Sequence, residues 1–161
     1  MERQLETEDF RIPRFELAYI GAIAYVRTFW WFVAIIPLSG LLLVTLGTGF
    51  MRAAGAMALL WPATIPARSL MASGKTSRSF ERGLRAWFEG DRVYFATGDE
   101  SGFQMAAANV RAVFRIGKYA ILQTRRFAVL PIPFTAWPGT DPEVTLRALE
   151  QWRATSERSD S

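Results

Sequence analysis

Residues Thr28–Met51 read TFWWFVAIIPLSGLLLVTLGTGFM, a run of 24 residues without a charged side chain. This run exceeds the roughly 20 residues that an α-helix needs to cross the hydrocarbon core of a bilayer. The aromatic cluster Phe29–Phe32 opens it and Arg27 precedes it; aromatic rings and snorkelling cations both favour the headgroup level. The run is too long, and starts too late, for a cleaved signal peptide. We therefore predict a membrane-spanning helix at about residues 29–49, with a helix buried in a soluble core as the alternative.

A second apolar run, AAGAMALLWPATIPA at residues 53–67, follows Arg52. It is short for a span, and the prolines at 62 and 66 are expected to kink a helix. Extended to about residues 52–71, with arginines snorkelling at both ends, the segment becomes long enough to cross. We predict a second spanning helix, and a re-entrant or interfacial segment is the alternative.

The stretch Gly47–Phe50 between these runs is short and rich in glycine, as a tight turn between antiparallel helices requires. Small residues in the second run would let the two backbones approach closely: Ala53, Ala54, Gly55, Ala56 and Ala58. Residues 28–72 are therefore predicted to form a transmembrane hairpin. The same small residues would also allow two copies of the chain to pack together, so a homo-oligomer formed through the hairpin is a further prediction.

Basic residues flank both outer ends of the predicted hairpin: Arg11, Arg14 and Arg27 precede it, and Arg68, Lys75, Arg78, Arg82 and Arg85 follow it. The turn carries only Arg52. Segments rich in Lys and Arg stay in the cytoplasm, so both termini are predicted to be cytoplasmic. Residues 1–27 then form an extended segment, around 8–16, and a pre-membrane helix. That helix either lengthens the first span or lies in the membrane interface.

From residue 73 the pattern changes. Residues 73–82 are a polar linker, after which apolar and polar residues alternate with a period of two. Six short runs predict an antiparallel meander at about residues 84–89, 92–96, 103–106, 110–116, 119–124 and 127–132. Asp141 is a suitable N-cap with Pro142 as first helical residue, and Leu146, Leu149 and Trp152 recur on one face. We predict a domain at residues 83–154 with a C-terminal helix, and a disordered tail at 155–161.

The chain contains no histidine and no cysteine. This excludes Ser-His-Asp and Cys-His mechanisms, thiolate metal sites and disulfides. Carboxylates lie close together at Glu89 and Asp91 and at Asp99 and Glu100, but in predicted turns, where such residues are ordinary. We predict no enzymatic activity, no cofactor and no metal.

The formal net charge is +4, and 17 of the 19 basic residues are arginine, which binds phosphate in a bidentate way. Five basic residues occupy two predicted hairpin turns and the strands between them, so several are expected to share one edge of the sheet: Arg111, Arg115, Lys118, Arg125 and Arg126. They are the candidate site for anionic lipid headgroups or a partner protein. The alternative role is protection of exposed strand edges. Aromatic residues do not interleave them, so no nucleic-acid binding is predicted.

Three regions resemble the YcxB-like family of bacterial membrane proteins, in a match that covers nearly the whole chain. The first runs from Glu8-Asp9-Phe10-Arg11-Ile12 through Arg27, and the second is Ser79–Leu84 or Phe88-Glu89-Gly90-Asp91. The most specific combines Val110–Val113, Tyr119–Leu122 and Ala128–Phe134 with its Ile-Pro step. The family commonly has a tryptophan before the Val110 strand, and Ala106-Ala107-Ala108-Asn109 stands there instead.

This resemblance implies an α+β membrane protein in which a two-helix transmembrane hairpin precedes a pleckstrin-homology-like (PH-like) antiparallel sheet or half-barrel and a C-terminal helix. It implies a multi-pass protein of the bacterial inner membrane and no particular activity. The function we expect is a non-enzymatic interaction or regulatory module that engages an anionic lipid surface or an unidentified membrane or cytoplasmic protein. The alternative is an accessory or stabilising subunit of a larger membrane complex, acting through the hairpin.

Overall fold

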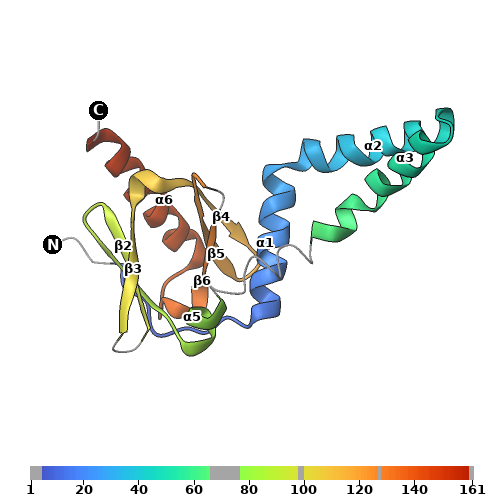
Figure 1. Ribbon diagram of the computed structural model, residues 1–161. Coiled ribbons are helices and arrows are strands. Elements are labelled where there is room, and N and C mark those ends of the chain that lie inside the picture. The colour runs from blue at the N-terminus through green and yellow to red at the C-terminus, as the bar shows by residue number, and fades with distance from the viewer. Residues whose placement is uncertain (1–4, 66–76, 98–99, 127, 160–161) are drawn as a thin grey trace.

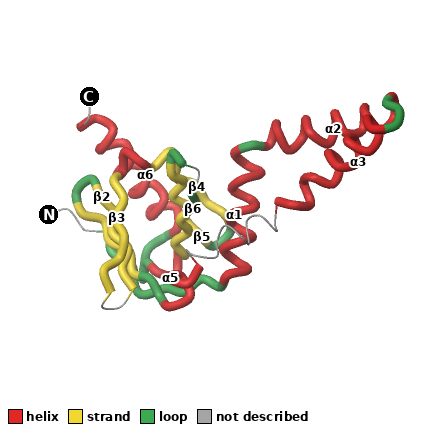
Figure 2. The backbone as a smooth tube through the Cα atoms, in the orientation of Figure 1, coloured by secondary structure: helices red, strands yellow, loops and turns green. Residues whose placement is uncertain are grey.

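The computed structural model describes residues 5–65, 77–97, 100–126 and 128–159. It shows an α+β domain from which two helices, α2 (Trp30–Leu46) and α3 (Phe50–Leu60), project as a hairpin (Figure 1). Six strands form two antiparallel sheets of three, in the orders β1-β2-β3 and β4-β5-β6. The predicted α+β class and meander are confirmed, with the strands divided between two sheets rather than joined in one (Figure 2).

The first sheet contains β1 (Arg85–Glu89), β2 (Arg92–Thr97) and β3 (Glu100–Ala106). Its alternating pattern places buried side chains such as Phe88, opposite Val93, on the core face. On the other face Trp87 stacks on Tyr94 with ring centroids 5.3 Å apart. Cross-strand aromatic pairs of this kind stabilise an antiparallel sheet.

The N-terminal segment adds to the edge of this first sheet. The backbones of Phe10 and Leu84 donate to each other at 2.8 Å in both directions, and the Thr7 amide donates to Ala86 O at 2.8 Å. Phe10 and Ile12 are buried in the main core. The extended segment expected near residues 8–16 is therefore present up to Pro13. It belongs to the same core as residues 83–154, so the domain is discontinuous in sequence and the hairpin is inserted into it.

The second sheet contains β4 (Val110–Ile116), β5 (Tyr119–Thr124) and β6 (Val129–Pro133). The predicted two-residue turn at Gly117 and Lys118 connects β4 to β5, and Gly117 has φ +54°, a conformation that glycine adopts without strain. The 3₁₀ turn η2 (Ala107–Asn109) separates the two sheets. Every residue of β5 except Thr124 is buried, so this strand lies at the centre of the fold.

Helix α6 (Pro142–Ser159) packs against β4 and lies between the two sheets in Figure 1. The Glu143 amide donates to Asp141 Oδ1 at 2.7 Å, which confirms the predicted N-cap. Leu149 is fully buried, and Trp152 donates from Nε1 to Gly90 O at 2.9 Å in the β1–β2 turn. The helix thereby ties the two sheets together.

Two expected boundaries change. Residues 77–82 of the expected 73–82 linker form a short helix, α5 (Ser77–Arg82), because Phe80 is fully buried and its carbonyl accepts from the Ile12 amide at 3.1 Å. Residues 73–76 lie outside the described residues. Helix α6 continues to Ser159, through most of the expected tail 155–161, because no glycine or proline interrupts it.

Helix α1 (Arg14–Thr28) and α2 are separate helices, bent by 80° at Phe29. Among the described residues, no single helix is long and apolar enough to span a membrane alone; α1 and α2 together are, but only as this bent pair. Helix α3 ends at Leu60 and tightens into the 3₁₀ turn η1 (Trp61–Ala63), as Pro62 predicts. The part of the predicted second span at 66–71 lies outside the described residues.

Within the hairpin the backbones of α2 and α3 meet at Gly40 and Gly55, which are the buried residues of the two helices. A Cβ atom on Gly40 would lie 2.8 Å from Gly55 O, and one on Gly55 would lie 2.6 Å from Gly40 O. Close packing through Gly55 and its small neighbour Ala58 agrees with the prediction, whereas Gly40 was not foreseen.

Candidate membrane-contacting surface

Apart from Ser39, Thr45 and Arg52, every residue of α2 and α3 is apolar or glycine. Helix α2 has no charged residue, yet of its residues only Gly40 is buried. Large side chains stand exposed along it and along α3, including Leu46 at 80% and Phe50 at 86%: Trp30, Trp31, Phe32, Ile35, Leu38, Leu41, Leu42, Leu43, Met51, Met57, Leu59 and Leu60. Contiguous apolar surface of this extent marks contact with a membrane or with another protein.

The polar side chains of helices α2 and α3 form hydrogen bonds within the hairpin. Ser39 Oγ donates to Ile36 O at 2.8 Å, and Thr45 Oγ1 donates to Leu41 O at 2.9 Å. At the tip, Arg52 Nε donates to Gly47 O at 2.8 Å, which satisfies a carbonyl at the C-terminal end of α2 and places a cation at the negative end of that helix. Internal satisfaction of polar groups is what a segment without water around it requires.

Helix α1 lies across the second sheet and is anchored at both ends to β5. Near its start, Glu16 accepts hydrogen bonds from Tyr119 Oη and, at 3.2 Å, from Lys118 Nζ. At its end, Gln123 Nε2 donates to Thr28 Oγ1 at 2.8 Å. The strand therefore runs alongside the helix for the length of β5, and α1 is held roughly at right angles to the hairpin (Figure 1).

The Glu16 anchor has perturbed ionisation. The hydrogen bond from Tyr119 holds the pKa of Glu16 below its ordinary value; partial desolvation opposes this, and Lys118 reinforces it. Burial, together with the hydrogen bond to Glu16, raises the pKa of the Tyr119 hydroxyl well above its ordinary value. The docked helix thus favours an ionised Glu16 and a protonated Tyr119.

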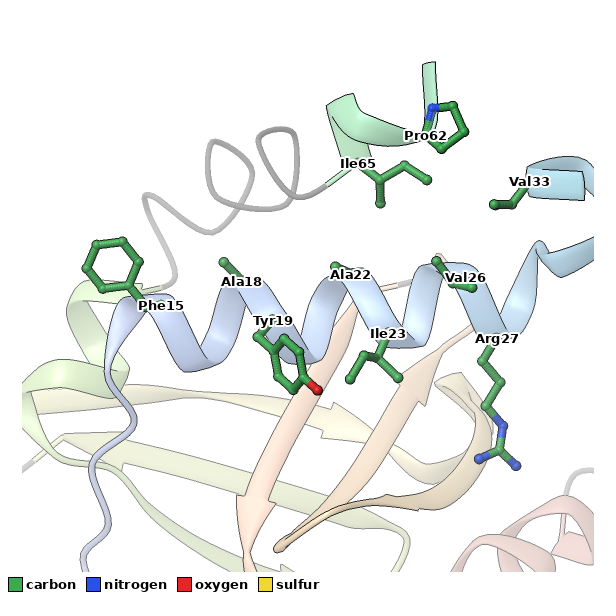
Figure 3. A pocket seen from close by; sticks show the side chains of 10 residues that line it. All are labelled: Phe15, Ala18, Tyr19, Ala22, Ile23, Val26, Arg27, Val33, Pro62 and Ile65. Atoms are coloured by element: carbon green, nitrogen blue, oxygen red, sulfur yellow. The ribbon is translucent and has the colours of Figure 1, made fainter. Parts of the chain in front are cut away.

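Helix α1 also lines an open apolar groove of about 750 Å³ in the corner between α1 and the base of the hairpin (Figure 3). Successive turns of α1 contribute most of the lining, and the hairpin contributes three residues: Phe15, Ala18, Tyr19, Ala22, Ile23, Val26 and Arg27, with Val33, Pro62 and Ile65. Phe15 and Tyr19 are 78% and 66% exposed. The apolar residues of α1 were the available signal; they predicted a helix that lengthens the first span or lies in the membrane interface, but not the groove.

The five basic residues, several of which were expected to share one edge, lie at two opposite ends of the second sheet. Arg111, Arg125 and Arg126 are at the end where Val110 pairs with Thr124, whereas Arg115 and Lys118 are at the other end, beside the β4–β5 turn. The antiparallel register explains this division, because the two hairpin turns lie at opposite ends of β5. The expectation of one shared edge therefore holds only for each group separately.

The two groups also differ in what their side chains contact. Lys118 pairs with Glu16, and Arg115 donates from Nε to Gly117 O at 2.8 Å with its guanidinium 5.4 Å from the Phe134 ring. The Arg153 guanidinium on α6 donates to the Arg111 carbonyl at 2.7 Å. Arg125 and Arg126 are exposed, and within the described ranges no side-chain partner is recorded for either. These two are the predicted residues best placed to meet a ligand.

No group of three or more His, Cys, Asp or Glu side chains suited to a metal ion occurs in the part of the chain that the structure describes. No protein-family model, curated protein or solved structure matches the chain. A functional proposal for this chain therefore depends on its exposed apolar surface and on its sequence.

Proposed function

We propose that this chain is an integral protein of the bacterial inner membrane, with the α2–α3 hairpin inserted in the bilayer and the α+β domain on the cytoplasmic side. The observation that carries the proposal is the projecting hairpin, which exposes large apolar side chains while the Ser39 and Thr45 hydroxyls of α2 bond within that helix. A lipid environment accounts for both the exposed apolar side chains and the internal hydrogen bonds. Helix α2 has 17 residues and does not reach the length of a full span by itself, so insertion of the hairpin requires the bilayer to thin around it.

In this arrangement α1 lies in the plane of the membrane surface, because it is bent by 80° from a hairpin directed into the bilayer. Its outer face then presents Phe15, Tyr19 and Ile23 to the interface, as interfacial amphipathic helices do. This supports the interfacial alternative for the pre-membrane helix. The two sheets and C-terminal helix support the resemblance to a PH-like domain and the YcxB-like family.

The domain acts, in this proposal, as a non-enzymatic recognition or regulatory module held against the membrane. The lack of histidine and cysteine supports a binding role over a catalytic one. Arg125 and Arg126 are its leading contacts for anionic headgroups or a partner protein.

The chain has no cysteine, so a single introduced thiol reports one position without background. The variant Thr48→Cys places it at the hairpin tip, and the matched control Asp91→Cys places it in the β1–β2 turn. In cells with a permeabilised outer membrane, a membrane-impermeant maleimide should label Thr48→Cys before the inner membrane is broken and Asp91→Cys only afterwards. If both variants are labelled only after lysis, the hairpin is re-entrant and does not span the membrane. If the chain is found in the soluble fraction of the broken cells and not with the membranes, the proposal is overturned.

A further inference from the structure

The groove between α1 and the hairpin base has a polarity gradient. Val33, Pro62 and Ile65 lie on the hairpin side of α1, and the side chains of Tyr19 and Arg27 extend to the opposite side, toward the sheet (Figure 3). These two bring the main polar atoms to a lining that is otherwise aliphatic or aromatic. Both polar tips thus lie on one side of α1, and the apolar lining continues into the exposed surface of the hairpin.

Arg27 is held in place without being neutralised. Its guanidinium carbon lies 4.6 Å from the ring centroid of Phe114 on β4, a cation–π contact that fixes the charge at the groove's edge. Across the described ranges no carboxylate is recorded within ion-pair distance of Arg27. An arginine positioned in this way, with its planar set of N–H donors, is suited to a phosphate.

We propose that this groove binds one phospholipid with an anionic headgroup. This inference rests on the proposed insertion of the hairpin. The acyl chains lie along the groove and continue beside α2, and the phosphodiester is bound by the Arg27 guanidinium. The occupant follows from charge complementarity and from continuity, because the groove opens onto the surface that the bilayer covers.

Two kinds of photoactivatable lipid test this inference on the full chain in mixed vesicles: phosphatidylglycerol and phosphatidylcholine, each with a diazirine in its acyl chain. The phosphatidylglycerol probe should label peptides of Phe15–Arg27 about fivefold more than the phosphatidylcholine probe at equal content. This factor corresponds to the roughly 1 kcal/mol that one arginine contributes near an anionic surface. Peptides of α2 and α3 should be labelled by both probes in proportion to vesicle composition.

Two variants test separately the charge of Arg27 and the space in the groove. Arg27→Gln should remove the preference at α1, whereas Arg147→Gln, on the exposed side of α6, should leave it unchanged. Ala22→Trp fills the groove and should reduce labelling of α1 by both probes while labelling of the hairpin persists. Equal labelling of α1 by both probes in the unmodified chain overturns the inference. Flotation of the same samples reports insertion: a chain that does not float with the vesicles refutes the membrane proposal, not merely the lipid preference.

Discussion

Gly40 and Gly55 face each other so closely that each carbonyl oxygen occupies the space in which the other residue's Cβ would lie. Replacing either glycine by alanine must therefore separate α2 from α3. We expect Gly55→Ala to destabilise the hairpin by about 1–3 kcal/mol, the usual cost of overpacking. Thermal unfolding of the detergent-solubilised protein measures this. Ala56→Leu, on the adjacent exposed position, is the control and should have little effect. Equal effects of both variants would show that the close contact contributes nothing.

The docking of α1 should depend on pH. Because the pKa of Glu16 is lowered in the folded state, its contribution is present above the ordinary value of 4.5 and is lost as pH falls through the lowered value. Tyr119 behaves in the opposite sense: its pKa is raised, so its contribution is present below 10.0 and disappears at higher pH. The mobility of a spin label on exposed Tyr19→Cys should increase at both extremes.

Tyr119→Phe tests the same anchor at constant pH. Loss of the phenol removes the main cause of the lowered Glu16 pKa, so carboxyl NMR should show that pKa rising toward its ordinary value. Tyr94→Phe, whose ring stacks on Trp87 in the first sheet, is the matched control. A Glu16 pKa that is unchanged in Tyr119→Phe contradicts the assigned hydrogen bond.

Arg52 should stabilise the hairpin tip through Gly47 O. Arg52→Ala removes a charged donor and the favourable interaction with the end of α2, for an expected loss of roughly 1–2 kcal/mol. Hydrogen exchange of the amides at residues 47–51 should become faster. The corresponding Arg147→Ala variant should leave exchange at the tip unchanged; faster exchange in both variants points to a global effect.

Arg125 and Arg126 should contribute to headgroup binding more than Lys118 does, since Lys118 is already paired with Glu16. Titration of the solubilised full chain with a soluble short-chain phosphatidylglycerol measures this by NMR. We expect about a fivefold weaker Kd for each of Arg125→Gln and Arg126→Gln, with the effect screened by salt. Unaltered binding in the double variant removes these residues from the site.

The sequence predicted features that depend on local chemistry. The Asp141 cap, the break at Pro62 and the turn at Gly117 follow from single residues with strong conformational preferences. The alternation of apolar residues likewise predicted the strands. Close packing by Gly55 followed from its size alone.

Features that depend on contacts between distant residues were missed. The 80° bend lies at Phe29, where the apolar run continues without proline or glycine, and it accompanies the docking of Thr28 onto Gln123. Residue Phe80 lies in a polar stretch with no periodicity, and only the contact with the N-terminal segment makes it core. Which of the basic residues share one edge could not be predicted, because their spacing along the chain does not reveal strand register.

The pairing of the N-terminal segment with β1 sets an order on biogenesis. A ribosome releases Phe10 long before Leu84, and the whole apolar hairpin emerges between them. The first sheet cannot acquire its edge, nor α1 its platform on β5, until the hairpin has left the ribosome. If the hairpin is inserted as proposed, the membrane receives it while the domain is still unfolded. Completion of the domain then fastens both ends of an already inserted hairpin to one rigid base.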